Sequence, residues 1–365
     1  LAQAELTNAP HQGYPRSGYS KRYTHALQWT SDTRCIMDSF RRLLASLAIL
    51  LVLAPAPATS ARADTDATLQ AQIRAAVARG LDWIGQHPAT LQDGGLPDLL
   101  DEGVGFLMLS TLSKDPGSRE RFDDSFRERM TALGEMPEFA QWAMSGQKRM
   151  TDYYHLVLAA HLMQQAGSPT DLQPYITAQA QRVLAATPYC DPTKRLTIAL
   201  FLLKLGEQPG ISVDAALTAS RIEQIARGRQ PALPTVSANP QQRLAASLHL
   251  YALLHEIIAL TDFGRQPPPA WLKSRLEPLN RFLVEAIAWA GSAGKVDLLS
   301  ELLLSAQFLE APLQAVLPDA LRQLLAGQQE DGSWGAYETH RPNKLRHAVF
   351  TATTALWSYA GTAPE

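Results

Sequence analysis

GQQEDGSWGAYETH, residues 327–340, precedes the last predicted helix of a 365-residue chain. Gln328 can bond backbone groups at the end of the helix before it. Asp331 and Gly332 favour a turn, because glycine tolerates positive φ and aspartate bonds its own backbone. Trp334 then supplies a broad apolar ring whose N–H needs one partner. The stretch therefore predicts a turn that fastens the last two helices to each other.

Apolar residues recur at helical spacing along most of the chain, and alternating strand-like stretches are absent. Glycine and proline residues mark the breaks between segments, and no low-complexity linker divides the chain. We predict helices at 68–86, 97–113, 118–134, 150–166, 171–187, 192–206, 213–226, 241–263, 269–291, 294–308, 312–327 and 342–361, with a further short helix at 136–145.

Two kinds of predicted helix alternate along the chain. One kind is apolar nearly all round, as in LTIALFLLKL (196–205), and the other carries a polar face, as in GSRERFDDSFRERM (117–130). A helix that is apolar all round is buried, whereas one with a polar stripe faces water. Alternation of about six of each predicts an all-α fold, an α/α toroid of two concentric rings. An irregular bundle or an α-solenoid is the alternative, although no fixed repeat period is present.

Residues 328–335, QQEDGSWG, resemble the QW motif, Q-x-x-D-G-x-W, of the terpenoid cyclase and protein prenyltransferase toroid superfamily. GLDWIGQHPATLQDGG (80–95) is similar to a degenerate copy that lacks the second tryptophan. The resemblance implies the α/α toroid. LLHEIIALTDFGR (253–265) looks like a segment of uncharacterised bacterial toroid-like proteins, and we expect Gly264 to end its helix in the left-handed conformation.

The motifs that carry this superfamily's known chemistry are absent. The chain has neither the Asp-x-Asp-Asp of proton-initiated cyclases nor the Asp-Asp-x-x-Asp of diphosphate-ionising enzymes. Cys190, in YCDPTKR, lacks the surroundings of a prenyltransferase zinc ligand. Leu205 stands where complement-type toroids have the thioester cysteine of Cys-Gly-Glu-Gln. A shared fold does not carry function, so the function must be sought in other residues.

Residues 37–63 are typical of a secretory signal peptide. Arg41 and Arg42 form a basic start, the apolar run 43–53 follows, and Ala61-Arg62-Ala63 provides a small-x-small cleavage site. The apolar run is shorter than the roughly 20 residues of a transmembrane helix, so we expect no stable membrane anchor after signal removal. The signal predicts a periplasmic or secreted protein.

Residues 1–36 precede this signal, and we expect them to be a non-native or disordered upstream extension. Residues 64–365 are then the single toroid domain. They hold one cysteine, Cys190, so no internal disulfide can form. The formal net charge of −2 gives no basic surface for nucleic acid. The expected partner is therefore an unknown extracytoplasmic substrate, with no nucleic acid.

Polar residues on the apolar helices are the candidates for a site, because burying them costs free energy unless they are paired or face a wet cavity. Asp297 and Glu301 are four residues apart and share a helix face, as do Tyr251 and His255. The predicted cavity residues are Glu102, Tyr153, His155, His255, Asp262, Asp297, Glu301 and His347.

Three interpretations of these residues stay open. They can be hydrogen-bonded pairs that fix helix register in a large core. They can form a catalytic cavity, in which a buried carboxylic acid and a second carboxylate or histidine act as acid and base on a substrate such as glycan. The catalytic candidates are Glu301, Asp297, His255 and His347, with Glu102, Tyr153, His155 and Asp262 as binding residues.

The third interpretation is a divalent metal site with His255, His347 and Glu301 as candidate ligands, although no His-Glu-x-x-His spacing is present. No other cofactor is predicted. A non-catalytic scaffold that uses the toroid for interaction is the rival from a different functional class. The sequence does not decide whether the protein is an enzyme.

Overall fold

A computed structural model describes residues 59–90, 95–168, 171–185, 192–235, 237–334 and 342–360. Contacts divide the chain into Leu1–Ala61 and Arg62–Glu365, and apart from the start of its first helix the described structure belongs to the second unit. The expected extension, Cys190 and the predicted signal up to residue 58 lie outside the described residues. The predicted cleavage site, Ala61-Arg62-Ala63, lies within the first described helix, α2.

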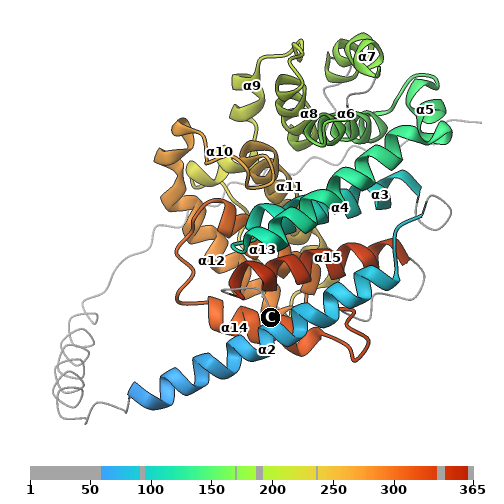
Figure 1. The fold of residues 1–365 in the computed structure, drawn as a ribbon. Coiled ribbons are helices and arrows are strands. Elements are labelled where there is room, and N and C mark those ends of the chain that lie inside the picture. Colours follow the sequence, from blue (N-terminus) through green and yellow to red (C-terminus); the bar gives the residue numbers. More distant parts are fainter. Residues whose placement is uncertain are drawn as a thin grey trace, which may run out of the picture. The chain divides into compact units, whose positions relative to one another are not determined.

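All regular structure in these described ranges is helical, apart from an isolated antiparallel bridge between Gln328 and Trp334. The expectation of an all-α protein is confirmed. The helices of Figure 1 are α2 (Thr59–Gln86), α3 (Gly95–Leu112), α4 (Pro116–Glu135), α5 (Pro137–Met144), α6 (Met150–Gln165), α7 (Gln173–Ala185), α8 (Pro192–Lys204), α9 (Val213–Thr218), α10 (Arg221–Ala226), α11 (Pro240–Thr261), the 3₁₀ helix η1 (Ala270–Arg275), α12 (Leu276–Ser292), α13 (Val296–Phe308), α14 (Leu317–Gly327) and α15 (Pro342–Tyr359).

Six helices contact one another in the order in which the chain visits them: α3, α6, α8, α11, α13 and α15. Each contacts the next, and α15 also contacts α3, where the series began. We call these six the core helices. The intervening helices pack against them: α4 against α3 and α6, α7 against α6, α9 against α8, α10 against α11, α12 against α13, and α14 against α13 and α15.

Burial differs between the two groups as the sequence pattern indicates. In the core helix α13, every residue from Asp297 to Ala306 is buried. The intervening helix α4 buries one stripe of side chains three or four residues apart, which is the spacing of a single helix face. That stripe consists of Ser118, Phe122, Phe126, Met130 and Leu133.

The predicted helix 213–226 is divided into α9 and α10, which corrects the sequence prediction. The side chain of Ser220 caps α10 at the division. The fully buried carboxylate of Glu256 accepts hydrogen bonds from the N–H groups of Arg221 at 2.9 Å and Ile222 at 3.1 Å. The first N–H groups of a helix have no partner within it, so the break supplies the donors that a buried carboxylate needs.

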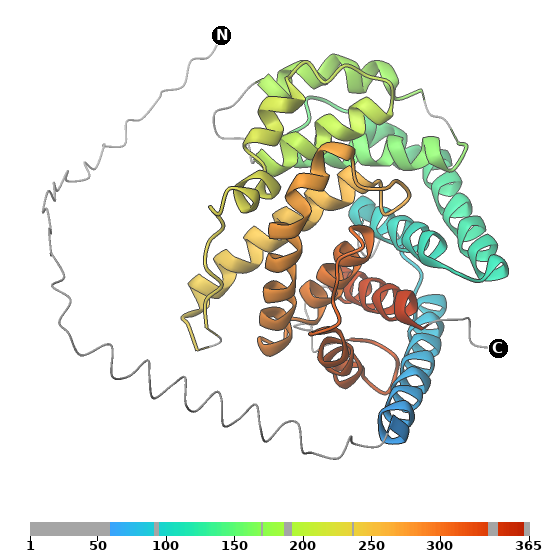
Figure 2. The ribbon, with the colours of Figure 1, turned by 90° about the vertical axis from the view of Figure 1, so that its left-hand side faces the viewer.

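The turn after α14 fastens the chain to α2 as well as to its neighbours. Gln328 Nε2 donates to the carbonyl of Ala76 at 2.8 Å, and Arg79 NH2 donates to Gln328 Oε1 at 2.5 Å. Gly332 has φ of 91°, and a Cβ there would lie 2.3 Å from the Arg79 carbonyl oxygen. The sequence predicted a link between the last two helices; the structure extends it to α2, which lies beside α15 in Figure 2.

Trp334 is the buried centre of this junction. Its side chain has no exposed surface, and its indole Nε1 donates to the carbonyl of Leu324 at 2.8 Å. Gly80 of α2 lies against the ring: a Cβ there would lie 3.0 Å from the indole and 2.3 Å from Thr353 Oγ1 of α15. The indole of Trp334 therefore packs against α2 and donates a hydrogen bond to α14. At this point α15 also approaches α2.

One helix in the described ranges, α11, is long and apolar enough to cross a membrane by length and composition alone. Of its most apolar window, 56% is buried inside the structure. It contacts α8 and α13, and a buried core helix meets the same criterion. The finding is therefore weak evidence for a membrane span.

Replacing Trp334 by alanine should lower the free energy of unfolding by about 3–5 kcal/mol, because a large buried ring is lost and a cavity is left among the helices it separates. Urea unfolding measures this change. The control is Trp271→Ala, since Trp271 is 38% exposed and should cost far less. Equal losses in the two variants would contradict the central role of Trp334.

Candidate functional site

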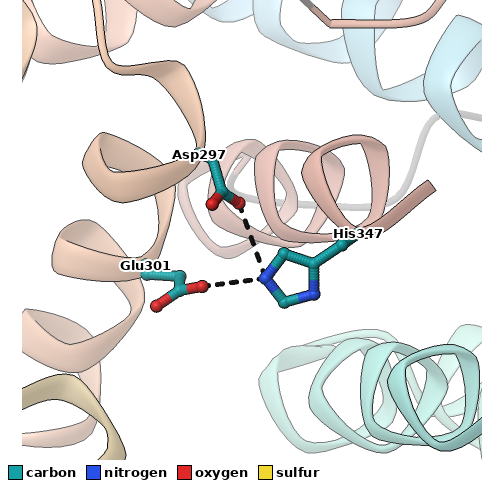
Figure 3. Close-up of side chains that lie close together, drawn as sticks. All are labelled: Asp297, Glu301 and His347. Atoms are coloured by element: carbon teal, nitrogen blue, oxygen red, sulfur yellow. Dashed lines mark hydrogen bonds and ion pairs between the residues drawn. The ribbon is translucent and has the colours of Figure 1, made fainter. Parts of the chain in front are cut away.

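α13 and α15 bring three of the predicted site residues into direct contact, as Figure 3 shows. Nε2 of His347 lies 2.8 Å from Oε1 of Glu301 and 3.5 Å from Oδ1 of Asp297. The two carboxylates are one turn apart in the first two turns of α13, so both reach the same imidazole. One donor atom from each residue lies within 4.8 Å of the others. We call Asp297, Glu301 and His347 the α13–α15 cluster.

The second ring nitrogen of His347 also faces a carboxylate. Its Nδ1 lies 3.3 Å from Oδ2 of Asp101 on α3. A proton on Nδ1 is held there by Asp101, which leaves Nε2 facing Glu301 and Asp297. Glu102 was predicted from the sequence as a site residue and Asp101 was not, because only the packing of α3 against α15 distinguishes the two neighbours.

Arg346, the residue before His347, holds α15 against α3. Its NH1 donates to Oδ2 of Asp98 at 2.8 Å, its Nε to the carbonyl of His87 at 3.0 Å, and its NH2 to the carbonyl of Pro88 at 3.3 Å. Asp98 and Arg346 are both buried. Removing one partner of such a pair leaves a buried charge unpaired, which typically lowers the free energy of unfolding by about 3–5 kcal/mol. The pair therefore determines where His347 meets α3.

Two hydroxyl groups orient Asp297. The phenol of Tyr251, on α11, donates to Oδ2 at 2.8 Å. The hydroxyl of Thr351, one turn after His347 on α15, donates to Oδ1 at 3.2 Å. Asp297 is thereby held by donors from two neighbouring helices.

The α13–α15 cluster concentrates negative charge around one imidazole. Burial raises the pKa of Glu301 to about 7, and the charge of Asp297 acts in the same direction while the bond with His347 opposes it. Burial also works against protonation of His347, but the carboxylates of Asp297 and Asp101 outweigh it and raise the pKa of His347 well above its usual value. Both shifts favour bound protons, so the cluster attracts positive charge.

Glu301 has an oxygen that nothing in the described residues satisfies. The residue is 7% exposed, and its Oε2 is buried without a hydrogen-bond partner there. A buried carboxylate oxygen without a donor is costly, so such an atom calls for an explanation. A bound cation beside the carboxylate would provide such an explanation.

Tyr154, on α6, borders the same cluster. Burial, with the charges of Asp101 and Glu301, raises the pKa of Tyr154 above its ordinary value. Its ring centroid lies 5.4 Å from that of His155 and 6.4 Å from that of His255. Burial lowers the pKa of His155, whereas His255 is exposed. Both histidines therefore lie beside Tyr154 rather than within the α13–α15 cluster.

Two of the predicted binding residues have separate, structural contacts. Glu102 is buried, accepts a hydrogen bond from the N–H of Ala89 at 3.2 Å and lies 3.5 Å from Nε of Arg129. Tyr153 is fully buried and donates its hydroxyl to the carbonyl of Ile176 at 2.8 Å. The interpretation of hydrogen-bonded pairs within a core fits both residues.

Asp262 also lies away from the cluster, because its carboxylate bonds His161 at 2.7 Å. The predicted cavity residues thus separate into several places. Of the three candidate metal ligands, His347 and Glu301 meet, and Asp297 takes the place expected for His255.

Raising the pH should destabilise the metal-free protein through Glu301. Its pKa is higher in the folded state than in the unfolded chain, so the folded state binds the proton more tightly and loses stability as pH rises from about 4.5 to 7. In the neutral variant Glu301→Gln, the fall in the free energy of unfolding across this pH range should be smaller by about 1–3 kcal/mol.

Urea unfolding at pH values from about 5 to 8 measures the effect. The matched control is Glu277→Gln, because that side chain is 85% exposed and should leave the pH dependence unchanged. A Glu301→Gln protein with the wild-type pH dependence would show that Glu301 ionises normally.

Comparison with known proteins gives one match. The family model described as "Domain of unknown function (DUF6895)" matches residues 104–355, which include the α13–α15 cluster and leave out Asp101. No curated protein and no solved structure matches the chain. Because the family model covers more than half of the chain, the chain belongs to the DUF6895 family.

Proposed function

We propose that the core helices form the inner ring of an α/α toroid, and that α2, α4, α7, α9 with α10, α12 and α14 form the outer ring. The support is the cyclic order of contacts, which runs from α3 through each core helix and back from α15 to α3. The burial of α13 on all sides and of α4 along one stripe agrees with inner and outer positions. The QW-like turn at 328–335 is consistent with the same arrangement.

We further propose that the protein binds a divalent transition metal through Asp297, Glu301 and His347. The observation that carries this proposal is the convergence of two carboxylates on one imidazole nitrogen, Nε2 of His347. A single proton on Nε2 can be bonded well by one of the carboxylates only. A divalent cation in its place would serve both, and would neutralise the charge that burial makes costly.

The surroundings of His347 fit a metal ligand. Metal-binding histidines usually donate the other ring N–H to a carboxylate or carbonyl, which fixes the tautomer and the ring orientation. Asp101 is in that position, 3.3 Å from Nδ1. Tyr251 and Thr351 orient the ligand Asp297 in the same way.

The spacing of the donor atoms is close to that of a metal site. Zinc bonds of about 2.0–2.2 Å in a tetrahedral arrangement place ligand atoms roughly 3.3 Å apart. The Nε2 to Oδ1 distance of 3.5 Å matches this spacing, and Oε1 of Glu301 at 2.8 Å must move back by about half an ångström. A combined imidazole and carboxylate set favours zinc, iron or manganese over magnesium and calcium.

Three protein ligands leave a coordination position for water or substrate, which is the usual difference between catalytic and structural zinc sites. His347 is 34% exposed, so the cluster is reachable from solvent. We therefore propose a metal-dependent hydrolytic or binding function on an extracytoplasmic substrate, with export resting on the signal-like segment 37–63.

A metal-free acid–base site is the second candidate, favoured by the pKa of Glu301 near neutrality. In that case Glu301 donates a proton and the site needs no cation. A non-catalytic scaffold would require neither a bound metal ion nor an acid–base site. Metal binding at the cluster separates the proposal from both alternatives.

Purified protein that has been stripped with chelator and reloaded should bind about one zinc or manganese ion per chain, measured by elemental analysis and calorimetry. His347→Ala and Asp297→Asn should abolish binding, because each removes a ligand. Asp101→Asn should weaken it by about 10–100-fold, because it removes the partner of Nδ1.

His255→Ala is the matched control and should keep wild-type metal content, since His255 lies beside Tyr154 and outside the cluster. Loss of metal in this variant, or unchanged metal in His347→Ala, would contradict the proposed ligand set. The wild-type protein failing to bind any of these ions would reject the metal proposal as a whole.

A further inference from the structure

A polar pocket is formed where α6, α8 and α11 end. Its volume is about 430 Å³, within the range of pockets that hold small molecules. None of its residues belongs to the α13–α15 cluster. Its lining residues include His161, Gln165, Lys204, Asp262, Arg265 and Gln266.

The backbone beside this pocket is strained. Asp262, Phe263 and Gly264 have φ values of 51°, 58° and 81°, so three successive residues are left-handed. The sequence predicted this conformation at Gly264 and a helix that continued to residue 263. The helix instead ends at Thr261. A non-glycine residue in this region costs about 1–2 kcal/mol, and such strain gathers at binding and catalytic sites.

Packing on both sides maintains the strained segment. The ring of Phe263 stacks on Phe201 at 5.9 Å, and Phe201 stacks on His161 at 5.0 Å. A Cβ on Gly264 would lie 2.3 Å from the ring of Phe308, so only glycine fits there. The segment is therefore fixed in place, and its polar side chains keep defined positions.

Asp262 is turned towards α6 and already has its hydrogen bonds. Its Oδ1 lies 2.7 Å from His161 Nε2, and Gln165 Nε2 donates to its two oxygens at 3.0 and 2.9 Å. The donors, led by the His161 hydrogen bond, outweigh the cost of burial and lower the pKa of Asp262. The residue is thus a carboxylate that is already satisfied.

Two cations, Lys204 and Arg265, line the pocket together with one carboxylate, Asp262. Lys204 Nζ lies 3.8 Å from Asp262 Oδ1 and donates to Gln266 Oε1 at 2.9 Å. Arg265 NH1 donates to Gln165 Oε1 at 2.6 Å. Amide oxygens carry no net charge, so the pocket has one uncompensated positive charge. Burial lowers the pKa of Lys204, which shows the cost of holding that charge there.

The helix ends offset part of this charge. Helix C-termini attract cations through their free carbonyl groups. Here turns already bond one carbonyl at each end: Gly167 N–H to Gln164, Gly206 N–H to Leu203, and Gln266 N–H to Thr261. A bound anion would balance the positive charge that remains.

We propose that this pocket binds a small anion with a carboxylate or phosphate group, held by Lys204 and Arg265 and hydrogen-bonded by the side-chain amide of Gln266. Arginine and lysine bind such oxyanions with strong, charge-assisted hydrogen bonds. The pocket's size suits a small organic anion rather than a polymer. This site is separate from the metal site in residues and in charge.

Calorimetric titration with inorganic phosphate and with succinate, at constant ionic strength and with chelator present, tests the proposal. At least one anion should bind saturably, and the one that does identifies the chemical class. Arg265→Gln and Lys204→Met should each weaken binding at least tenfold. Arg265 is exposed, so its variant should fold normally.

Arg281→Gln is the matched control, because Arg281 is exposed and paired with Glu277 on α12; it should bind as the wild type does. Glu301→Gln should also retain anion binding, so failure of the metal proposal leaves this one standing. Absence of saturable binding by both anions, or wild-type affinity in Arg265→Gln and Lys204→Met, would overturn the proposal.

Discussion

The buried ion pair between Arg346 and Asp98 determines how the chain closes on itself. It joins α15 to α3, and the same guanidinium bonds the carbonyls of His87 and Pro88 after α2. Each residue lies within one helical turn of a site residue: His347 follows Arg346, and Asp101 lies three positions after Asp98. The ion pair thus brings His347 to Asp101 as a consequence of folding. Trp334 and Gln328 strengthen the closure by attaching the α14–α15 turn to α2.

This arrangement gives the site an excess of negative charge. Asp101, Asp297 and Glu301 surround the imidazole of His347, and their charges raise its pKa. In a protein interior such charges must be paired or neutralised, and protons do so at low pH. The proposed metal ion would do the same at neutral pH and would give the unpartnered oxygen of Glu301 a partner. The proposed metal therefore follows from the cost of burying the carboxylates.

Local pattern predicted much of the fold and half of the site. Helical periodicity gave the all-α class and the alternation of buried and striped helices, and the four-residue spacing placed Asp297 and Glu301 on one face. Contacts between distant segments decided the rest. Asp101 could not be chosen over Glu102 without the packing of α15 on α3, and His255 faced Tyr154 instead of the carboxylates. The division of 213–226 depended on a buried glutamate, Glu256, from another helix.

The proposed metal site holds one divalent ion on His347, Asp297 and Glu301. X-ray absorption spectroscopy of the zinc-loaded protein tests it most directly, because it reports the ligand atoms themselves. If these three residues bind the ion, it should have nitrogen and oxygen neighbours at about 2.0–2.2 Å, including the multiple-scattering signature of one imidazole, and no sulfur. A sulfur neighbour at about 2.3 Å would instead identify a cysteine as a ligand, and a shell of water oxygens alone would show that the cluster does not hold the ion.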